Sequence, residues 1–302
     1  MKCLVTGGAG FLGSWLCEKL AAEGHEVTAI DNFLSGSKNN LGKGIKLVSA
    51  DVTKPIKDIK TDVIFHLASL ASPKFYKDMP IETMMANSFG TFNLLKLAEN
   101  NNAKFVYASS SEIYGDPKEH PQKETYYGNV NTVGERSCYD EGKRFGEALT
   151  YSFSKKHGIE YTIVRIFNTY GPRMRKDDGR VMPNFINQAL AGKDITIYGS
   201  GKQTRSFCYV TDTVDGIVKA AFFNSSDVFN IGNPKEMTMI ELAETIKRLT
   251  GSKSKIMFTE IGKDDPERRK PDISKAKSIL KWEPKIILEE GLKPTIEWFK
   301  KA

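Results

Sequence analysis

The sequence lacks the features that mark membrane, secreted and metal-stapled proteins. Its four cysteines, at positions 3, 17, 138 and 208, form no Cys-x-x-Cys pair, and no histidine stands at metal-ligand spacing. No stretch approaches the roughly 18 apolar residues of a membrane span. A strand-like run starts at Lys2, which leaves no room for a signal peptide. These absences predict a cytoplasmic protein with reduced thiols, no metal site and no membrane partner.

Strong charge of one sign is also missing. The 302 residues carry 44 Lys plus Arg against 37 Asp plus Glu, a net charge of +7 that is not gathered in one basic run. Nucleic-acid binding requires a basic stripe in a recognisable module, so we expect no nucleic-acid partner. A small polyanionic ligand accounts for the surplus equally well, as does chance.

Short apolar runs alternate with helical patterns over the first two thirds of the chain. The runs are typical of strands buried on both faces and cover residues 2–6, 26–31, 45–51, 62–68, 104–109 and 161–167. Helical patterns lie between them at 11–23, 81–101 and 139–157. A parallel crossover needs a covering helix. The alternation therefore predicts an α/β fold with a doubly wound parallel sheet of the Rossmann type.

The pattern changes after residue 171. Helical patterns are separated there by loops rich in Gly, Lys and Asp, at residues 183–192, 212–224, 238–250, 274–281 and 288–301. A strand-like run at 228–231 is expected to return to the main sheet. We predict a Rossmann domain at 1–170, joined again by 207–233, and a smaller C-terminal α/β lobe at 171–206 and 234–302 that lies over the mouth of the sheet.

A glycine-rich turn follows the first strand. Gly7, Gly10 and Gly13 allow a tight turn, close approach of a pyrophosphate and close packing of the helix that follows. Asp31 ends the second strand, where it would bind ribose hydroxyls and repel a 2′-phosphate, which favours NAD over NADP despite nearby Lys38. The alternative is a structural turn with a capping aspartate. Further residues expected around the cofactor are Phe11, Leu12, Asn32, Asp51, Val52, Leu67 and Ser69.

Tyr139 and Lys143 stand four residues apart in a helical pattern, and so share one face. Tyrosine has a pKa near 10 and is a poor base at neutral pH. A nearby ammonium favours the phenolate and is expected to lower that pKa. Such a pair could then take a hydroxyl proton while hydrogen leaves the same carbon. An isolated pair of this kind is usually exposed surface, so the hypothesis depends on its place after the glycine-rich turn.

Polar residues follow the strand at 104–109, at the edge of the sheet where ligands bind in such folds. Ser110 is the candidate to bridge the tyrosine hydroxyl and the reacting oxygen, with Ser111 and Glu112 beside it. Taken alone, these residues would be interpreted as a polar loop.

Longer strings resemble a known family over nearly the whole chain. They are Ser-Cys-Tyr-Asp-Glu-Gly-Lys-Arg at 137–144, Arg-Ile-Phe-Asn-Thr-Tyr-Gly-Pro-Arg-Met at 165–174, Tyr-Gly-Ser-Gly-x-Gln-Thr-Arg-Ser-Phe at 198–207 and Asp-Asp-Pro-Glu-Arg-Arg-Lys-Pro-Asp at 264–272. With the glycine turn and the serine loop, they resemble the UDP-glucuronate decarboxylases (UDP-xylose synthases) among the extended short-chain dehydrogenases/reductases.

This resemblance implies an NAD-dependent enzyme that oxidises C4 of UDP-glucuronate, loses the C6 carboxylate and reduces C4 again. Tyr139 would be base and then acid, and Lys143 would lower its pKa and bind the nicotinamide ribose. Glu112 and Arg269 would serve decarboxylation. The residues implied to bind the UDP-sugar, mainly in the C-terminal lobe, are Asn168, Arg173, Arg180 and Arg205. Without the family, Arg269 would be interpreted as part of a solvated basic loop.

Some residues depart from the family or leave alternatives open. Ser111 stands where 4,6-dehydratases carry an aspartate, which disfavours that reaction. Met85 stands where a lysine is common, which leaves open another uronate. A nucleotide-sugar 4-epimerase and a non-catalytic NAD-binding protein are the rival functions. Relatives pair through two helices, here 81–101 and 139–157, so we expect a homodimer, although apolar faces on these helices could equally be core.

Overall fold

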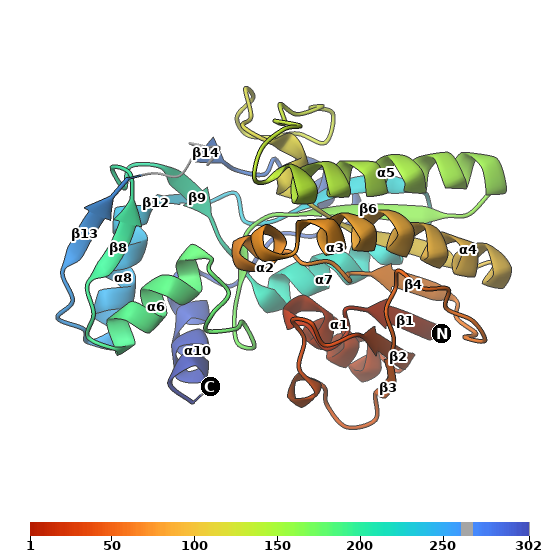
Figure 1. The fold of residues 1–302 in the computed structure, drawn as a ribbon, viewed down its shortest axis with the longest axis horizontal. Helices are drawn as coiled ribbons and strands as arrows, with labels where there is room; N and C mark the ends of the chain where they lie inside the picture. Colours follow the sequence, from red (N-terminus) through yellow and green to blue (C-terminus); the bar gives the residue numbers. More distant parts are fainter. Residues whose placement is uncertain (261–267, 302) are drawn as a thin grey trace.

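A seven-stranded sheet forms the centre of the protein in a computed structural model that describes residues 1–260 and 268–301 (Figure 1). Its strand order is β11-β6-β5-β4-β1-β2-β3, and every neighbouring pair is parallel. The order reverses beside β1, where open sheets of this kind form a crevice at the carboxyl ends of the strands. The strands are Lys2–Thr6 (β1), Glu26–Asp31 (β2), Lys46–Ser49 (β3), Val63–His66 (β4), Lys104–Ser110 (β5), Tyr161–Ile166 (β6) and Asp227–Ile231 (β11).

Helices cover both faces of this sheet. On one face, α1 (Phe11–Ala22) packs against α7 (Val210–Ala221), and on the other α4 (Thr91–Asn101) packs against α5 (Ser137–His157) (Figure 1). Successive residues of β1 belong to different core clusters, with Val5 on the α1 side and Leu4 on the α4 side. Burial on both faces explains why the strands appear as continuous apolar runs. The predicted doubly wound parallel sheet is confirmed, and β11 occupies its edge.

A smaller lobe lies beside the carboxyl ends of the strands (Figure 1). Its helices are α6 (Val181–Leu190), α8 (Met239–Thr250) and α10 (Leu288–Lys301). Its strands form a parallel pair, β8 (Ile195–Tyr198) with β13 (Ile256–Thr259), and a three-stranded sheet in which β9 (Thr204–Ser206) lies between β12 (Glu236–Thr238) and β14 (Arg268–Arg269). A short pair, β7 (Thr169–Tyr170) with β10 (Cys208–Tyr209), lies where the chain passes between sheet and lobe. Two further short helices are α2 (Pro73–Asp78) and α9 (Ser274–Ile279).

The structure differs from the sequence predictions in two places. The helix expected at 81–101 consists of α3 (Pro80–Met85), a π-helical turn (Ala86–Gly90) and α4. In that turn the Asn87 side chain donates to Ser69 Oγ at 3.0 Å, which places the irregular turn beside the sheet edge, as is frequent at functional sites. The short strands of the lobe were not predicted, because two to four residues show no period. The string at 264–272 lies partly outside the described residues.

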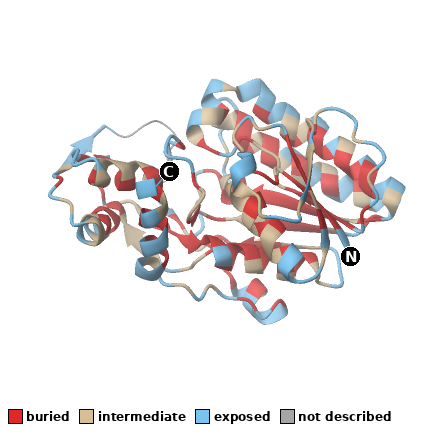
Figure 2. Ribbon diagram, turned by 90° about the horizontal axis from the view of Figure 1, so that it is seen from below, coloured by how far each residue is buried: buried red, intermediate tan, exposed pale blue. Residues whose placement is uncertain are grey.

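Burial follows the layers. Figure 2 shows buried strands at the centre and exposed residues along the outer sides of the helices. The four cysteines are all buried free thiols. In the described ranges, no helix combines the length and apolar character needed to cross a membrane. Over the same ranges, His, Cys, Asp and Glu form no group of three that could hold a metal ion.

Candidate active site

Two adjoining cavities, of about 480 and 260 Å³, open at the carboxyl edge of the sheet. They share Glu112, Tyr139, Asn168 and Arg180 in their walls. The predicted residues that line the first cavity alone are Gly7, Gly10, Phe11, Leu12, Gly13, Asp31, Asn32, Asp51, Val52, Leu67, Ser69, Ser110, Ser111, Lys143 and Arg173. Those that line the second alone are Arg205 and Arg269. The fold thus brings every predicted site residue to one connected space.

The glycine turn allows α1 to begin directly against β1. Gly7 has φ +68°, and its carbonyl oxygen accepts the N–H of Gly10 at 3.0 Å. A Cβ on Gly13 would lie 2.0 Å from the Gly7 carbonyl oxygen, so no larger residue fits without moving the backbone. The first-turn N–H groups of α1 therefore face the cavity with no partner inside the helix. Such an arrangement is suited to an anion such as a pyrophosphate.

Asp31 supports this turn as well as lining the cavity. Its carboxylate accepts the N–H of Ala9 at 3.0 Å and the N–H of Phe33 at 2.8 Å. Burial raises the pKa of Asp31, and these two hydrogen bonds oppose the rise. Asp31 therefore has the structural role in the glycine turn that the sequence left as the alternative. It also lines the first cavity.

Tyr139 lies in the first turn of α5 at the junction of the two cavities. Burial raises the pKa of its phenol to about 12, and a hydrogen bond with Ser110 opposes the rise. Ser110 ends β5, so the sheet edge and the helix bring these two hydroxyls together. The shift runs opposite to the lowering that we expected from Lys143, because desolvation of the phenolate is the larger effect.

Lys143 is buried one turn further along α5. Its Nζ donates to the carbonyl of Ala108 at 2.9 Å and lies 5.8 Å from the ring centre of Tyr139. Burial lowers the pKa of Lys143 to about 7, with Glu147 opposing the shift. A lysine in this state carries only part of its charge at neutral pH, which limits its effect on the tyrosine.

Glu112 is held between two arginines. One carboxylate oxygen pairs with Arg136, which precedes α5, and the other pairs with Arg269 of β14. Burial raises the pKa of Glu112, but the two guanidinium groups outweigh burial and hold that pKa well below its usual range. Arg269 is buried, and its Nε and Nη2 have no hydrogen-bond partner among the described residues. Two donors of one guanidinium are therefore available to an anion at this point.

The other predicted substrate residues occupy different parts of the cavities. The Asn168 side chain donates to the Ser206 carbonyl at 3.4 Å, and Arg205 lines the second cavity from β9. Arg180 pairs with Asp178 at the shared wall. Arg173 lines the first cavity, where it lies 4.5 Å over the Trp15 ring and pairs with Glu18 at 2.7 Å. Arg173 thus stands at the cofactor end and not among the arginines of the second cavity.

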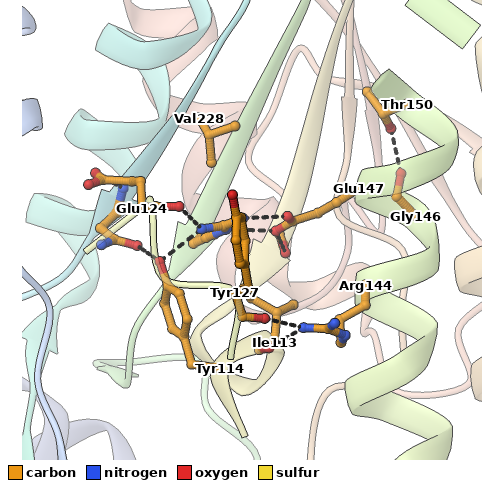
Figure 3. A network of polar contacts seen from close by, with 12 residues as sticks. Ile113, Tyr114, Glu124, Tyr127, Arg144, Gly146, Glu147, Thr150 and Val228 are labelled. Carbon is orange, nitrogen blue, oxygen red and sulfur yellow. Dashed lines mark hydrogen bonds and ion pairs between the residues drawn. The ribbon is translucent and has the colours of Figure 1, made fainter. Parts of the chain in front are cut away.

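A buried polar network fixes α5 to the sheet behind the site (Figure 3). Glu147 accepts two hydrogen bonds from Arg165 of β6, at 3.0 and 2.8 Å, and one from Ser109 at 2.5 Å. Arg165 also donates to the Tyr114 hydroxyl at 3.0 Å, and Tyr114 donates to Asn230 of β11 at 2.8 Å. These bonds join β5, β6 and β11 to the helix that carries Tyr139 and Lys143.

Sequence reasoning missed two residues at the second cavity. Tyr76 of α2 stacks on Tyr139 with ring centres 5.4 Å apart and planes at 13°. Arg136 stands three residues before Tyr139, next to the specific string at 137–144, and this position was the signal that could have found it. Tyr76 has no comparable signal, because only the fold brings α2 against α5. Met85, the departure from the family, lines the first cavity.

Comparison with known proteins places the chain in a family. Residues 3–232 match the NAD dependent epimerase/dehydratase family. UDP-glucuronic acid decarboxylase 1 of Xenopus tropicalis is 51% identical over 99% of this chain and 72% of that protein. UDP-glucuronic acid decarboxylase 3 of Arabidopsis thaliana is 53% identical over 97% of this chain and 87% of that protein.

Solved structures agree at the level of the fold. UDP-glucose 4-epimerase of Thermotoga maritima, solved with UDP-glucose, superimposes with a TM-score of 0.92 and 32% identity, covering 100% of this chain and 99% of that one. UDP-glucuronic acid 4-epimerase of Bacillus cereus, in complex with UDP-glucuronic acid and NAD, superimposes with a TM-score of 0.90 and 29% identity. The match covers 100% of this chain and 99% of that one. The higher identity lies with the decarboxylases. The chain therefore belongs to the UDP-glucuronic acid decarboxylases within the NAD dependent epimerase/dehydratase family.

Proposed function

We propose that this chain converts UDP-glucuronate to UDP-xylose and carbon dioxide, with NAD as a recycled cofactor. The observation that carries the proposal is the buried guanidinium of Arg269, a residue of the second cavity's wall, whose Nε and Nη2 have no hydrogen-bond partner among the described residues. A buried donor without a partner is costly, and a carboxylate accepts two parallel bonds from one guanidinium. The C6 carboxylate of a uronate supplies such a partner, and a neutral hexose does not.

The charges of the second cavity support the same substrate class. Among the described residues, its lining includes four arginines, namely Arg136, Arg180, Arg205 and Arg269, and one carboxylate, Glu112. A UDP-uronate brings a diphosphate and a carboxylate. We propose that Arg205 and Asn168 bind the diphosphate end and that Arg269 binds the sugar carboxylate. The lobe at 171–206 and 234–302 is then the nucleotide-sugar-binding part.

The first cavity fits NAD. A Cβ at Gly7 or at Gly13 would clash with backbone atoms, so these glycines let α1 begin close against β1, and the first residues of α1 line the cavity. Asp31 and Asn32 line the end of β2, where ribose hydroxyls bind in Rossmann folds, and Asp51 with Val52 lines the end of β3. Arg173 lies beside α1 and would meet the cofactor's diphosphate. Residues 1–170 with 207–233 are then the cofactor-binding part.

The proposed chemistry requires NAD and the side chains of the two cavities, and no second cofactor. When bound, NAD supplies the oxidation of C4 and its later reduction. A ketone at C4 makes the C6 carboxylate that of a β-keto acid, so the C5–C6 bond breaks and its electron pair becomes an enolate on the C4 oxygen. Carbon dioxide leaves, and C5 takes up one proton from solvent water. Arg269 would stabilise the carboxylate and then the enolate charge.

Tyr139 would carry the proton of the C4 hydroxyl. Its hydrogen bond with Ser110 gives the phenol a partner through which a proton can move. Lys143, held on the Ala108 carbonyl, would bind the nicotinamide ribose and favour the phenolate by its remaining charge. Glu112 stays ionised between its two arginines, which makes it a fixed negative group and not the acid that protonates C5.

We also propose a homodimer formed through α3, α4 and α5. These neighbouring helices, with the π-helical turn between α3 and α4, expose large apolar residues, namely Ile81, Met84, Phe89, Phe92, Phe145 and Tyr151. Exposed apolar patches of this kind are typical of interfaces. The cytoplasmic location stays a prediction from the sequence.

Product mass tests the function directly. Purified protein with NAD and UDP-glucuronate is expected to yield UDP-xylose, lighter than the substrate by one carbon dioxide. A 4-epimerase would leave the mass unchanged, and a protein that only binds NAD would give no product. Either result would contradict the proposal.

Two variants test the assigned roles. Tyr139→Phe is expected to retain NAD and lose at least about 10²-fold in kcat, since it removes the proton carrier. Arg269→Ala is expected to slow carbon dioxide release more than C4 oxidation, so that reduced cofactor accumulates at 340 nm. Equal loss of both steps would make Arg269 a residue that only binds the substrate.

A further inference from the structure

Arg136 occupies a fixed position next to the catalytic turn. Its carbonyl accepts the N–H groups of Tyr139 and Asp140, each at 3.0 Å, so it is bound into the first turn of α5. A residue three positions before Tyr139 lies on the same side of that turn. The backbone of Arg136 is therefore fixed to the segment that carries the tyrosine.

The guanidinium contacts three groups at once. It pairs with one oxygen of Glu112, its Nε is 3.9 Å from a carboxylate oxygen of Asp140, and its centre is 5.9 Å from the ring centre of Tyr76. A planar group with five donors can make several such contacts in fixed directions, and a lysine cannot. Arg136 therefore links an acid of the second cavity to the aromatic ring that stacks on Tyr139.

Glu112 transmits this arrangement to the lobe. Its second oxygen pairs with Arg269, which comes from β14, whereas Arg136 is the residue directly before α5. The direction of the Arg269 pair depends on where Glu112 is held. Arg136 thus helps to determine where the two free nitrogens of Arg269 point.

From these contacts we propose that Arg136 is a positioning residue for decarboxylation. It holds Glu112 as the bridge that aims Arg269 at the substrate carboxylate, and it steadies Tyr139 through Tyr76. The proposal rests on the proposed function. It assigns Arg136 no transfer of electrons or protons.

Removal of Arg136 has a defined electrostatic consequence. The charged and titratable groups around Glu112 are Arg136, Arg205, Arg269, Asp140, Tyr139 and Tyr76. Burial raises the pKa of Glu112, and Arg136 is the largest of the opposing influences. Arg136 also opposes the rise in the pKa of Asp140, so without it the pKa values of both carboxyls rise and their ionised forms are lost at a higher pH. The acid limb of the kcat profile should therefore move to higher pH.

The variants Arg136→Met and Arg136→Lys test the proposal, with Arg144→Met as matched control. Arg144 lies on the same helix and donates to the backbone carbonyls of Ile113 and Tyr127. We expect Arg136→Met to lose about 10²-fold in kcat and to shift the acid limb upward. Arg136→Lys keeps the charge, so its acid limb should stay near that of the parent while kcat falls less. Arg144→Met should have the same acid limb of the kcat profile as the parent protein.

Binding provides a second readout that does not depend on turnover. In protein loaded with NADH, which cannot oxidise C4, calorimetry compares UDP-glucuronate with UDP-glucose, a ligand without the carboxylate. The parent should prefer UDP-glucuronate, and Arg136→Met should lose about 10-fold or more of that preference. If Arg136→Met does not fold, Arg136→Lys carries the same comparison with a smaller loss.

The outcomes separate the two proposals. A parent protein without any preference for UDP-glucuronate contradicts the proposed function. A parent that discriminates, together with an Arg136→Met variant of unchanged preference and pH limb, overturns the role of Arg136. Equal losses of kcat in Arg136→Met and Arg136→Lys, with an unchanged acid limb of the kcat profile, also overturn that role. They would indicate that Arg136 only supports the local structure.

Discussion

Lys143 is a side chain whose burial lowers the stability of the folded protein. It is buried beneath the sheet edge with the Ala108 carbonyl as acceptor, and burial lowers its pKa to about 7. A lysine in the unfolded chain titrates near 10.4. Between these values the unfolded chain binds more protons, so this group makes stability rise with pH. The penalty is complete below pH 7 and disappears above about pH 10.4.

Lys143→Met should therefore inactivate the protein while stabilising its fold. Removing a charge that is costly to bury should raise the melting temperature at pH 6–7 by at least ~2 °C. The advantage should shrink as pH approaches 10. Scanning fluorimetry of both proteins across this range measures the difference. An equal or lower melting temperature for the variant at every pH would contradict the interpretation.

At the scale of elements, the contact between α5 and the sheet depends on a buried ion pair. Arg165 and Glu147 have side chains that are 11% and 13% exposed, and they belong to β6 and α5. Removing one partner leaves the other charge buried, which typically costs about 3–5 kcal/mol. Tyr114, which is labelled in Figure 3, and Ser109 add hydrogen bonds to the pair. The helix that carries Tyr139 and Lys143 is thus fixed by polar bonds as well as by apolar packing.

Arg165→Met tests the importance of this pair. We expect it to lower the free energy of unfolding by about 3 kcal/mol or more. A suitable control is Arg248→Met, because Arg248 pairs with Glu289 at 2.7 Å on the surface, where the side chains are 57% and 52% exposed. Exposed pairs contribute about 0–1 kcal/mol. Urea unfolding of both variants compares them, and similar values would show that the buried pair adds nothing.

At the scale of the whole molecule, the second cavity lies where two parts of the chain meet. Glu112 follows β5 of the sheet, and Arg269, 157 positions later, comes from the three-stranded sheet of the lobe. The pair therefore forms only when both parts are folded against each other. The exposed apolar residues of α3, α4 and α5 lie on the sheet side of the molecule, so a second copy bound there would leave the lobe free.

The oligomeric state tests this arrangement. Sedimentation of the parent at micromolar concentration is expected to show a dimer, and Phe89→Asp should shift it to a monomer by placing a charge in the apolar patch. Phe89 is 55% exposed, and Met257 of β13 in the lobe is 50% exposed. Met257→Asp, the matched control, should remain dimeric. A monomeric parent, or two variants that behave alike, would contradict the proposed interface.

What the sequence determined by itself is local. The spacing of Gly7, Gly10 and Gly13, the alternation of strands and helices, and the four-residue step from Tyr139 to Lys143 depend on neighbours in the chain. These patterns predicted the parallel sheet correctly, and they placed the glycine turn, Tyr139 and Lys143 at one cavity, where their roles stay predictions. The resemblance added Arg269, whose surroundings no local pattern describes.

The tertiary structure decided what depends on distant residues and on the loss of water. It brought Arg136 and Arg269 to opposite oxygens of Glu112, and it stacked Tyr76 on Tyr139. Burial in the folded chain raised the pKa of Tyr139, opposite to the prediction from its lysine neighbour alone. Desolvation and long-range pairing arise only from the packed fold, and sequence spacing carries no measure of either.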